Sequence, residues 1–306
     1  MRDPGLYDYL PYDSRRPTIT WPNGAPVAVW VAPNLEFYEL APPNNPHRAS
    51  WGRPEPDVMG YAYRDYGNRV GFQRMFEAMQ KFGIRGSASL NVAMCDHAPE
   101  VIEICAEAGW EFYSHGIYNT RFMLGMSEDQ ERELIQDSID TILKHTGQRL
   151  DGWLSPALSY TERTLEIVAE MGLSYVCDLF HDDQPAPLNV PSGKLVSIPY
   201  SLEMNDVIAY NVNLLSPRRY GEVIRRQFDV LYRESVESGS GTVMCIPIHP
   251  YLVGRPHRIA AFEEALGYIA GHDDVWFATG REIAAHFVAN SYDDFVAAGR
   301  APGAVA

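Results

Sequence analysis

The pattern of hydrophobic and polar positions is one of short apolar runs that alternate with segments of helical spacing. The first apolar run, Pro26 to Ala32, has the length and continuity of a strand that is covered on both faces. The next segment repeats its apolar residues at helical intervals and stops at Gly83, a residue type that commonly ends helices. The chain therefore begins as a strand followed by a helix.

This alternation continues to the end of the chain. Further strands are predicted over residues 85–92, 109–115, 151–154, 174–179, 195–199, 241–248 and 275–278. Helices are predicted over residues 99–108, 127–145, 161–171, 217–237, 258–270 and 279–290. Repeated strand–helix units with short connections favour a parallel sheet, and no shift in composition divides the chain. We predict one α/β barrel domain over residues 1–306.

Two segments lack this periodicity. Residues 1–25 are rich in Pro, Tyr and Arg, and we expect an N-terminal arm that lies on the body of the protein or on a neighbouring subunit. Residues 37–68 form a long loop rich in aromatic residues. Loops of this length are usually functional or disordered, and the aromatic residues favour an ordered lid or a subunit contact.

Polar side chains with catalytic potential follow the predicted strands. In α/β barrels the chemistry lies at the C-terminal rim of the strands, so these side chains are expected to meet there. Histidines together with several carboxylates and amides indicate either a metal site or general acid–base catalysis. The candidates are Asn34, Glu36, His115, Asn119, Asp178, His181, Asp182, Asp183, Asn205, Asp206 and His249.

The order of these residues resembles the polysaccharide deacetylase superfamily, whose members are distorted (β/α)7 barrels, and within it the branch of allantoinase-like and cyclic-imide-hydrolase proteins. Asn34-Leu35-Glu36 stands where members carry a pair of aspartates. His115-Gly116-Ile117-Tyr118-Asn119 stands where members carry His-x-x-x-His. Trp153-Leu154-Ser155-Pro156 replaces an Arg-x-Pro motif, and His249 matches a late histidine that acts as general acid. The resemblance covers most of the chain and implies the same barrel.

The departures from the family pattern bear on a metal. Asn34 cannot act as a general base, because an amide has no useful pKa, and Asn119 is a poorer zinc ligand than imidazole. The resemblance implies that Glu36, His115 and Asn119 would hold a divalent metal, with zinc preferred, if one is bound. Some allantoinase-like members are thought to work without a metal, and the sequence leaves the metal-bound and metal-free forms equally open.

The activity implied by the resemblance is hydrolysis of an amide-type carbon–nitrogen bond in a small, open-chain or cyclic substrate. Glu36 would ligate the metal or deprotonate the attacking water, His115 would orient that water, and His249 would protonate the leaving nitrogen. Asn34, Arg69, Asn119 and Asp183 are candidate substrate-binding residues. Arg69 could instead be a structural partner of Glu36, and Asp182 and Asp183 could instead cap their own loop.

Two other functions stay open. One is a metal-dependent deacetylase of sugar N-acetyl groups, against which the departures at Asn34, Asn119 and Leu154 count. The other is a catalytically inactive barrel that binds a ligand, and the amide at Asn34 keeps this alternative open. A screen across ureides, hydantoins, cyclic imides and acetylated amino sugars distinguishes all three.

Composition limits the partners. The formal net charge of −15 is a poor match for nucleic acid or an anionic membrane, and no apolar run approaches membrane-spanning length. The four cysteines are scattered without zinc or disulfide spacing, and the N-terminus has no apolar signal core, so a cytoplasmic protein is expected. We expect a small-molecule substrate and a homo-oligomer, either a dimer or a tetramer.

Overall fold

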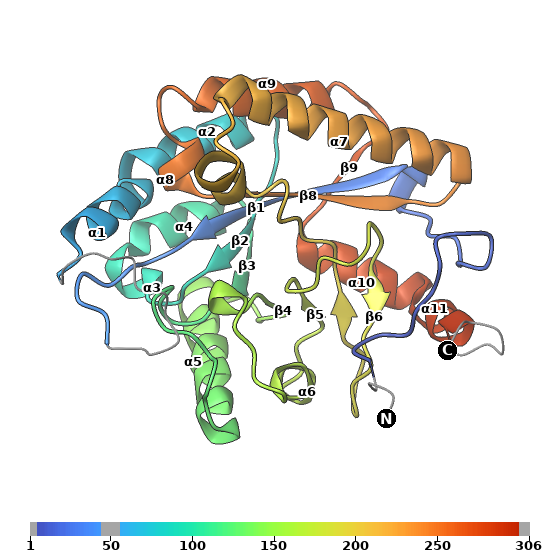
Figure 1. Ribbon diagram of the computed structural model, residues 1–306, viewed down its shortest axis with the longest axis horizontal. Helices are drawn as coiled ribbons and strands as arrows, with labels where there is room; N and C mark the ends of the chain where they lie inside the picture. Colours follow the sequence, from blue (N-terminus) through green and yellow to red (C-terminus); the bar gives the residue numbers. More distant parts are fainter. Residues whose placement is uncertain (1–4, 44–55, 300–306) are drawn as a thin grey trace.

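The centre of the molecule is a curled, mainly parallel sheet surrounded by helices (Figure 1). A computed structural model describes residues 5–43 and 56–299. Along the sheet the strands follow the order β6-β7-β5-β4-β3-β2-β1-β8, and β9 pairs separately with β1. The strands are β1 (Val27–Leu35), β2 (Ser87–Leu90), β3 (Glu111–Ser114), β4 (Gly152–Trp153), β5 (Tyr175–Val176), β6 (Ala186–Pro187), β7 (Val196–Ser197), β8 (Thr242–Ile248) and β9 (Trp276–Phe277). This arrangement confirms the predicted distorted barrel fold of the deacetylase type.

β1 is the central strand, and every one of its residues is buried. It pairs in parallel with β2 and with β8, where Asn34 is opposite Ser89 and Pro33 is opposite Ile248. β3 follows β2 in the same direction, with Leu90 opposite Ser114. Because these strands are parallel and in register at this end, the residues that follow β1, β3 and β8 emerge at one edge of the sheet.

The sheet is a half-barrel. Within the described residues, its two outer strands, β6 and β8, form no ladder of hydrogen bonds with each other. β6 lies antiparallel to β7, and the segment before it crosses toward β8. There the backbone N–H of Val243 donates to the carbonyl oxygen of Asp183 at 2.8 Å. This segment bridges the gap at the amino end of β8.

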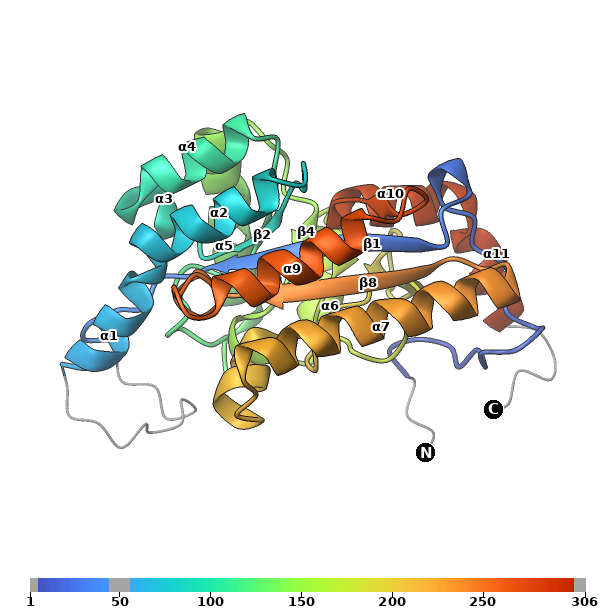
Figure 2. The same ribbon diagram turned by 90° about the horizontal axis from the view of Figure 1, so that it is seen from above.

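The helices cover the outer face of the sheet, with α7 and α9 side by side in both views (Figures 1 and 2). The α-helices are α1 (Val58–Asp65), α2 (Phe72–Gln80), α3 (Met94–His97), α4 (Pro99–Glu107), α5 (Glu128–Thr146), α6 (Thr164–Glu170), α7 (Pro217–Ser238), α8 (Pro250–Val253), α9 (Ile259–Ala270), α10 (Gly280–Asn290) and α11 (Tyr292–Gly299). Shorter 3-10 and π-helical turns are η1 (Pro22–Gly24), η2 (Gly67–Gly71), η3 (Pro156–Leu158) and η4 (Ile208–Val212).

The helix boundaries follow from local chemistry. α5 begins with a capping box, in which the Ser127 side chain accepts from the backbone N–H of Gln130 while the Gln130 side chain accepts from that of Ser127. It ends at Gly147, whose φ of 68° is the left-handed conformation that favours glycine. α7 starts with Ser216 as the cap and Pro217 in the first turn.

The long loop predicted over 37–68 was wrong in part, because α1 begins at residue 58. The signal for this helix is Asp57, whose side chain accepts from the backbone N–H of Gly60 at 2.8 Å. In the sequence, the Pro, Gly and Tyr residues around Asp57 make this helix start hard to recognise. Residues 44–55 of the predicted loop, and residues 1–4 of the predicted arm, lie outside the described residues.

The described part of the N-terminal arm lies on the body of its own chain. The Nη1 of Arg16 is 2.7 Å from the Oδ1 of Asp182, and the ring of Tyr7 stacks on that of His181 with 3.9 Å between centroids. The arm and α11 lie at the end of the molecule opposite α1 (Figure 2). Among the helices described, none combines the length and the apolar character needed to cross a bilayer.

Candidate active site

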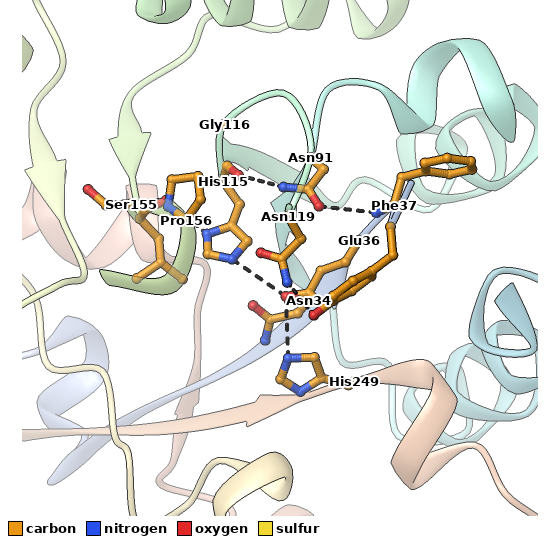
Figure 3. Close-up of polar contacts among 12 residues, drawn as sticks. Asn34, Glu36, Phe37, Asn91, His115, Gly116, Asn119, Ser155, Pro156 and His249 are labelled. Carbon is orange, nitrogen blue, oxygen red and sulfur yellow. Dashed lines mark hydrogen bonds and ion pairs between the residues drawn. The ribbon is translucent and has the colours of Figure 1, made fainter. Parts of the chain in front are cut away.

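Three predicted side chains meet at the carboxyl edge of the sheet. Glu36 follows β1, His115 follows β3 and His249 follows β8, and Figure 3 shows these side chains pointing toward one another. The Nε2 of His115 and the Nε2 of His249 each lie 3.5 Å from the Oε1 of Glu36. The three residues are only 5–6% exposed. The structure therefore brings together residues that are up to 213 positions apart in the chain, from 36 to 249.

The tautomer of His115 is determined by its backbone contact. Its Nδ1 lies 2.9 Å from the carbonyl oxygen of Leu154, which can only accept a hydrogen, so Nδ1 carries a proton. The Nε2 then faces Glu36. The carbonyl oxygen of His115 accepts from the amide of Asn91 at 2.5 Å, and the other end of that amide accepts from the N–H of Phe37 at 3.1 Å. Asn91 thereby ties the segments after β1 and β3 to each other.

His249 is held by a buried carboxylate. Its Nδ1 lies 2.7 Å from Oδ1 of Asp206, and its backbone N–H donates to Oδ2 of Asp206 at 2.9 Å. Burial alone would lower the pKa of His249, but the negative charges of Glu36 and Asp206 outweigh it and raise that pKa to about 10. His249 is therefore protonated at neutral pH and directs an N–H at Glu36.

Glu36 is the complementary charge. Burial alone would raise the pKa of its carboxyl group, but the positive charge of His249 and the hydrogen bond from that imidazole hold it well below its usual range. Its Oε2 is buried and has no hydrogen-bond partner among the described residues. An unpaired buried carboxylate oxygen is costly, so this atom is suited to a donor that arrives from outside the protein, such as water or a substrate N–H.

The two predicted amides lie beside Glu36 (Figure 3). The Nδ2 of Asn34 donates to the carbonyl oxygens of Ala32 and Ile248 at 3.3 and 3.2 Å, which joins the ends of β1 and β8. The Nδ2 of Asn119 donates to the hydroxyl of Tyr38, and its Oδ1 is buried without a partner among the described residues. Asn119 consequently offers the site an unpaired acceptor, whereas the donors of Asn34 are already used.

Arg69 does not reach this site. The sequence predicts that Arg69 binds the substrate or, alternatively, pairs with Glu36, and the structure places its side chain elsewhere. The side chain is 73% exposed, and its Nε lies 2.7 Å from Oδ2 of Asp65. Arg69 lies in the π-helical turn η2, where its φ of −116° and ψ of −110° interrupt the helix. The guanidinium therefore pairs with the carboxylate four residues earlier.

Asp183 also lies away from Glu36. Its carbonyl oxygen accepts from Val243 at the amino end of β8, whereas His249 follows the carboxyl end of the same strand. With about 3.3 Å per strand residue, six residues separate these ends by about 20 Å. Asp183 instead lines a cavity of about 950 Å³ between the arm, the segment after β5 and α11, together with Arg16 and His181. The prediction was wrong in placement because the chain turns back along the sheet after β5.

Several contributing residues were not assigned roles from the sequence. Asp206 follows no strand directly and comes just before η4, so only its acidic side chain could indicate it. Burial raises the pKa of Asp178 to about 6, and its Oδ1 accepts from the N–H of Ser155 at 2.7 Å, which fixes the turn after β4. The carbonyl of Leu154 acts through its backbone, which the identity of the residue does not reveal.

The donor set of the site differs from that of a structural or catalytic zinc site. Across residues 5–43 and 56–299, no three His, Cys, Asp or Glu side chains are grouped so that they could hold a metal ion. The predicted set of Glu36, His115 and Asn119 supplies one carboxylate, one imidazole and an amide. The second imidazole, His249, holds a proton. Zinc takes three or four strong donors, so these residues do not fit a tightly bound zinc ion.

Several known proteins are similar to this chain in sequence and in fold. Residues 56–176 match the polysaccharide deacetylase family model. The chain is 28% identical over 303 residues to a Schizosaccharomyces pombe protein named "Putative polysaccharide deacetylase", covering 87% of this chain and 92% of that protein. It is 24% identical over 270 residues to the peptidoglycan deacetylase of Helicobacter pylori, covering 78% of this chain and 89% of that protein.

Among solved structures, the crystal structure of Puue allantoinase superposes with a TM-score of 0.83 at 29% identity, covering 95% of this chain and 99% of that one. The sequence relatives, the matched fold and the family resemblance at Glu36, His115 and His249 agree with one another. Residues 56–176 therefore resemble a polysaccharide deacetylase domain, and the chain is a deacetylase-like hydrolase that acts on amide-type carbon–nitrogen bonds.

Proposed function

We propose that the chain hydrolyses a carbon–nitrogen bond in a small ureide, imide or amide, of the kind that allantoinases and cyclic-imide hydrolases act on. The observation that carries the proposal is the position of the Glu36 carboxylate between the imidazoles of His115 and His249. The pKa of His249 is about 10, so this ring is protonated at neutral pH. The burial of all three side chains favours a small substrate that can enter the site over a polymer chain. The structural likeness to Puue allantoinase supports the same class.

Glu36 and His115 prepare the water in this proposal. The Oε2 of Glu36 accepts a hydrogen bond from the water and orients its oxygen toward the substrate carbonyl. Because Nδ1 of His115 is protonated, Nε2 of the neutral ring carries the lone pair and takes the proton that the water loses as its oxygen bonds to the carbonyl carbon. The Glu36 carboxylate, 3.5 Å away, then stabilises the imidazolium that forms.

His249 completes the reaction. Its Nε2–H is transferred to the leaving nitrogen as the carbon–nitrogen bond breaks, which avoids expulsion of an amide anion. Asp206 keeps the ring oriented through Nδ1. When the product leaves, His115 releases the proton that it took from the water, and His249 takes up a proton from solvent, which returns both rings to their starting state.

Enzymes of the polysaccharide deacetylase family are typically metal-dependent. In this chain an amide, Asn119, stands at the third position of the predicted metal set, and His249 is protonated. The proposed reaction therefore uses the side chains of Glu36, His115 and His249.

The experiment is a hydrolysis screen of the purified enzyme against ureides, hydantoins, cyclic imides and acetylated amino sugars, with Glu36→Gln as the matched inactive control. We expect turnover of a ureide, hydantoin or imide that the control lacks. Turnover confined to acetylated amino sugars would replace this proposal with a sugar deacetylase. No turnover of any class, with ligand binding retained, would indicate a binding protein.

We also propose that the protein is a homo-oligomer. The described arm carries exposed apolar side chains at Leu6, Tyr9 and Tyr12, which are 48%, 63% and 52% exposed. Exposed apolar patches of this kind often mark contacts between chains. Light scattering tests the proposal, and a monodisperse monomer at the assay concentration would contradict it.

A further inference from the structure

Tyr38 lies beside the site, two residues after Glu36. Its hydroxyl accepts a hydrogen bond from Nδ2 of Asn119. The guanidinium of Arg64, on α1, lies over its ring with the central carbon 3.9 Å from the ring centroid. Glu36 and Arg64 both act on Tyr38 electrostatically, so a carboxylate and a cation both lie near the phenol.

The contact with Asn119 determines what the hydroxyl can do. An amide NH₂ only donates, so the phenol oxygen is the acceptor in this contact. A phenol also has one hydrogen to donate, and no acceptor for the Tyr38 hydrogen is found among the described residues. Tyr38 therefore has an unused donor beside the carboxylate that orients the water.

Each amide side chain around the site has at least one acceptor for its Nδ2 group. The Nδ2 of Asn34 donates to Ala32, Ile248 and Tyr200, that of Asn68 to the carbonyl of Glu36, and that of Asn91 to the carbonyl of His115. The backbone N–H of Phe37 donates to Asn91, and that of His249 to Asp206. Tyr38, by contrast, keeps a neutral donor without an acceptor among the described residues, and that donor is available to a substrate oxygen.

We propose that Tyr38 is a further catalytic residue, whose hydroxyl donates a hydrogen bond to the carbonyl oxygen as it becomes negatively charged when water adds to the substrate. This inference rests on the proposed function. No proton moves from Tyr38 in this role: the oxygen gains charge as the water oxygen bonds to the carbon, and it loses the charge when the carbon–nitrogen bond breaks. A donor that is already oriented stabilises this charge without reorganising.

The surroundings of Tyr38 suit such a role. Burial and the negative charge of Glu36 raise the pKa of Tyr38 above its ordinary value, so the phenol keeps its hydrogen across the working range of pH. The Arg64 cation over the ring favours negative charge near the hydroxyl. Asn119, which the sequence predicts as a substrate-binding residue, orients the phenol in this arrangement.

The test is Tyr38→Phe, which removes only the hydroxyl. With a ureide or imide that the wild-type enzyme hydrolyses, we expect kcat to fall about 10²–10³-fold, the usual loss for one oxyanion donor, while KM stays within about threefold. The basic limb of the pH profile is expected to stay in place, because His249 sets it. The matched control is Tyr118→Phe, whose hydroxyl lies 3.5 Å from Nε2 of His97, and its kcat is expected to stay at the wild-type level.

The outcomes separate this inference from the proposed function. An active wild-type enzyme with kcat for Tyr38→Phe within about threefold of wild type, or with the whole loss in KM, would overturn the role of Tyr38 alone. An equal loss of kcat in Tyr118→Phe would overturn it too, because the effect would then be structural. A wild-type enzyme that hydrolyses nothing in the screen would remove the proposed function and the oxyanion role with it.

Discussion

Two buried glutamates lie at opposite edges of the same sheet and differ in their partners. Glu36 follows the carboxyl end of β1, and Glu111 is the first residue of β3. They are similarly buried, at 5% and 3% exposure. Both oxygens of Glu111 have partners: Oε1 accepts from Tyr175 at 2.6 Å, and Oε2 accepts from Ser87 and from the N–H of Arg281, each at 2.9 Å.

The partners explain the opposite electrostatics. Burial raises the pKa of Glu111, since its partners are mainly neutral hydroxyls and a backbone N–H. The pKa of Glu36 is lowered, because the charge of His249 and the hydrogen bond from its imidazole outweigh burial. Glu111 links β3, β5 and the start of α10, so it holds the amino edge together. Glu36 keeps one oxygen for an incoming molecule. Burial alone therefore does not identify a reactive carboxyl group, whereas burial with an unpaired oxygen beside imidazoles does.

The largest expected effect is that of Glu36→Gln on turnover. The amide keeps the shape of the side chain but can neither orient the water as an anion nor stabilise a cationic His115. We expect kcat to fall about 10²–10⁴-fold, as for the loss of a group in acid–base catalysis. Glu111→Gln is the matched control and should keep kcat at temperatures where it is folded. Equal losses of kcat in both variants would show that Glu36 has no special catalytic role compared with Glu111.

The next effect concerns the charge on His249. Its protonated form is the acid, so kcat/KM should fall as pH rises through its pKa, which is about 10 in the native protein. Asp206→Asn removes one of the two negative charges that raise this pKa. The basic limb should therefore move to lower pH, by more than about one unit for a buried partner. A pH profile that is unchanged in this variant would show that His249 is not the acid.

A smaller effect, on stability, is expected for Glu111→Gln. The substitution removes one acceptor from a buried group with three donors, and such changes cost about 1–3 kcal/mol of the free energy of unfolding. Chemical denaturation of Glu111→Gln and Glu36→Gln side by side measures it. We expect a measurable loss at Glu111, and no loss there would show that its three hydrogen bonds do not hold the amino edge of the sheet together.

The smallest effect is expected from chelation. If the imidazoles, and not a metal ion, keep Glu36 ionised, dialysis against a strong chelator should leave kcat within about twofold of the untreated enzyme. Emission spectroscopy of the same samples gives the metal content. A loss of activity that returns with added zinc would show that a metal completes the site despite its weak donor set.

The sequence predicts the fold well where the apolar runs are continuous. β1 and β8 are long and fully buried, and both were found within a few residues of the predicted bounds. The predicted runs 174–179 and 195–199 contain only two ladder residues each, because the sheet curls and few of their backbone groups stay in register. Periodicity shows that a strand exists but not how long its ladder is.

The candidate site was predictable in part for the same reason. Glu36, His115 and His249 follow strands directly, so parallel pairing alone brings them to one edge. Arg69 and Asp183 lie in irregular segments, where the path of the backbone decides the direction of the side chain. Tyr38 and Arg64 meet only because α1 lies in the predicted loop, which the pattern of polar residues did not reveal.

The proposed reaction requires Glu36 and His249 to act as one catalytic unit. A double-mutant cycle on kcat/KM tests this requirement most directly. Glu36→Gln, His249→Gln and the double variant are compared with the wild-type enzyme on the best substrate of the screen. Residues that act as a unit are strongly non-additive, so the double variant should lose little more than the worse single variant. Losses that multiply as independent factors would contradict the account.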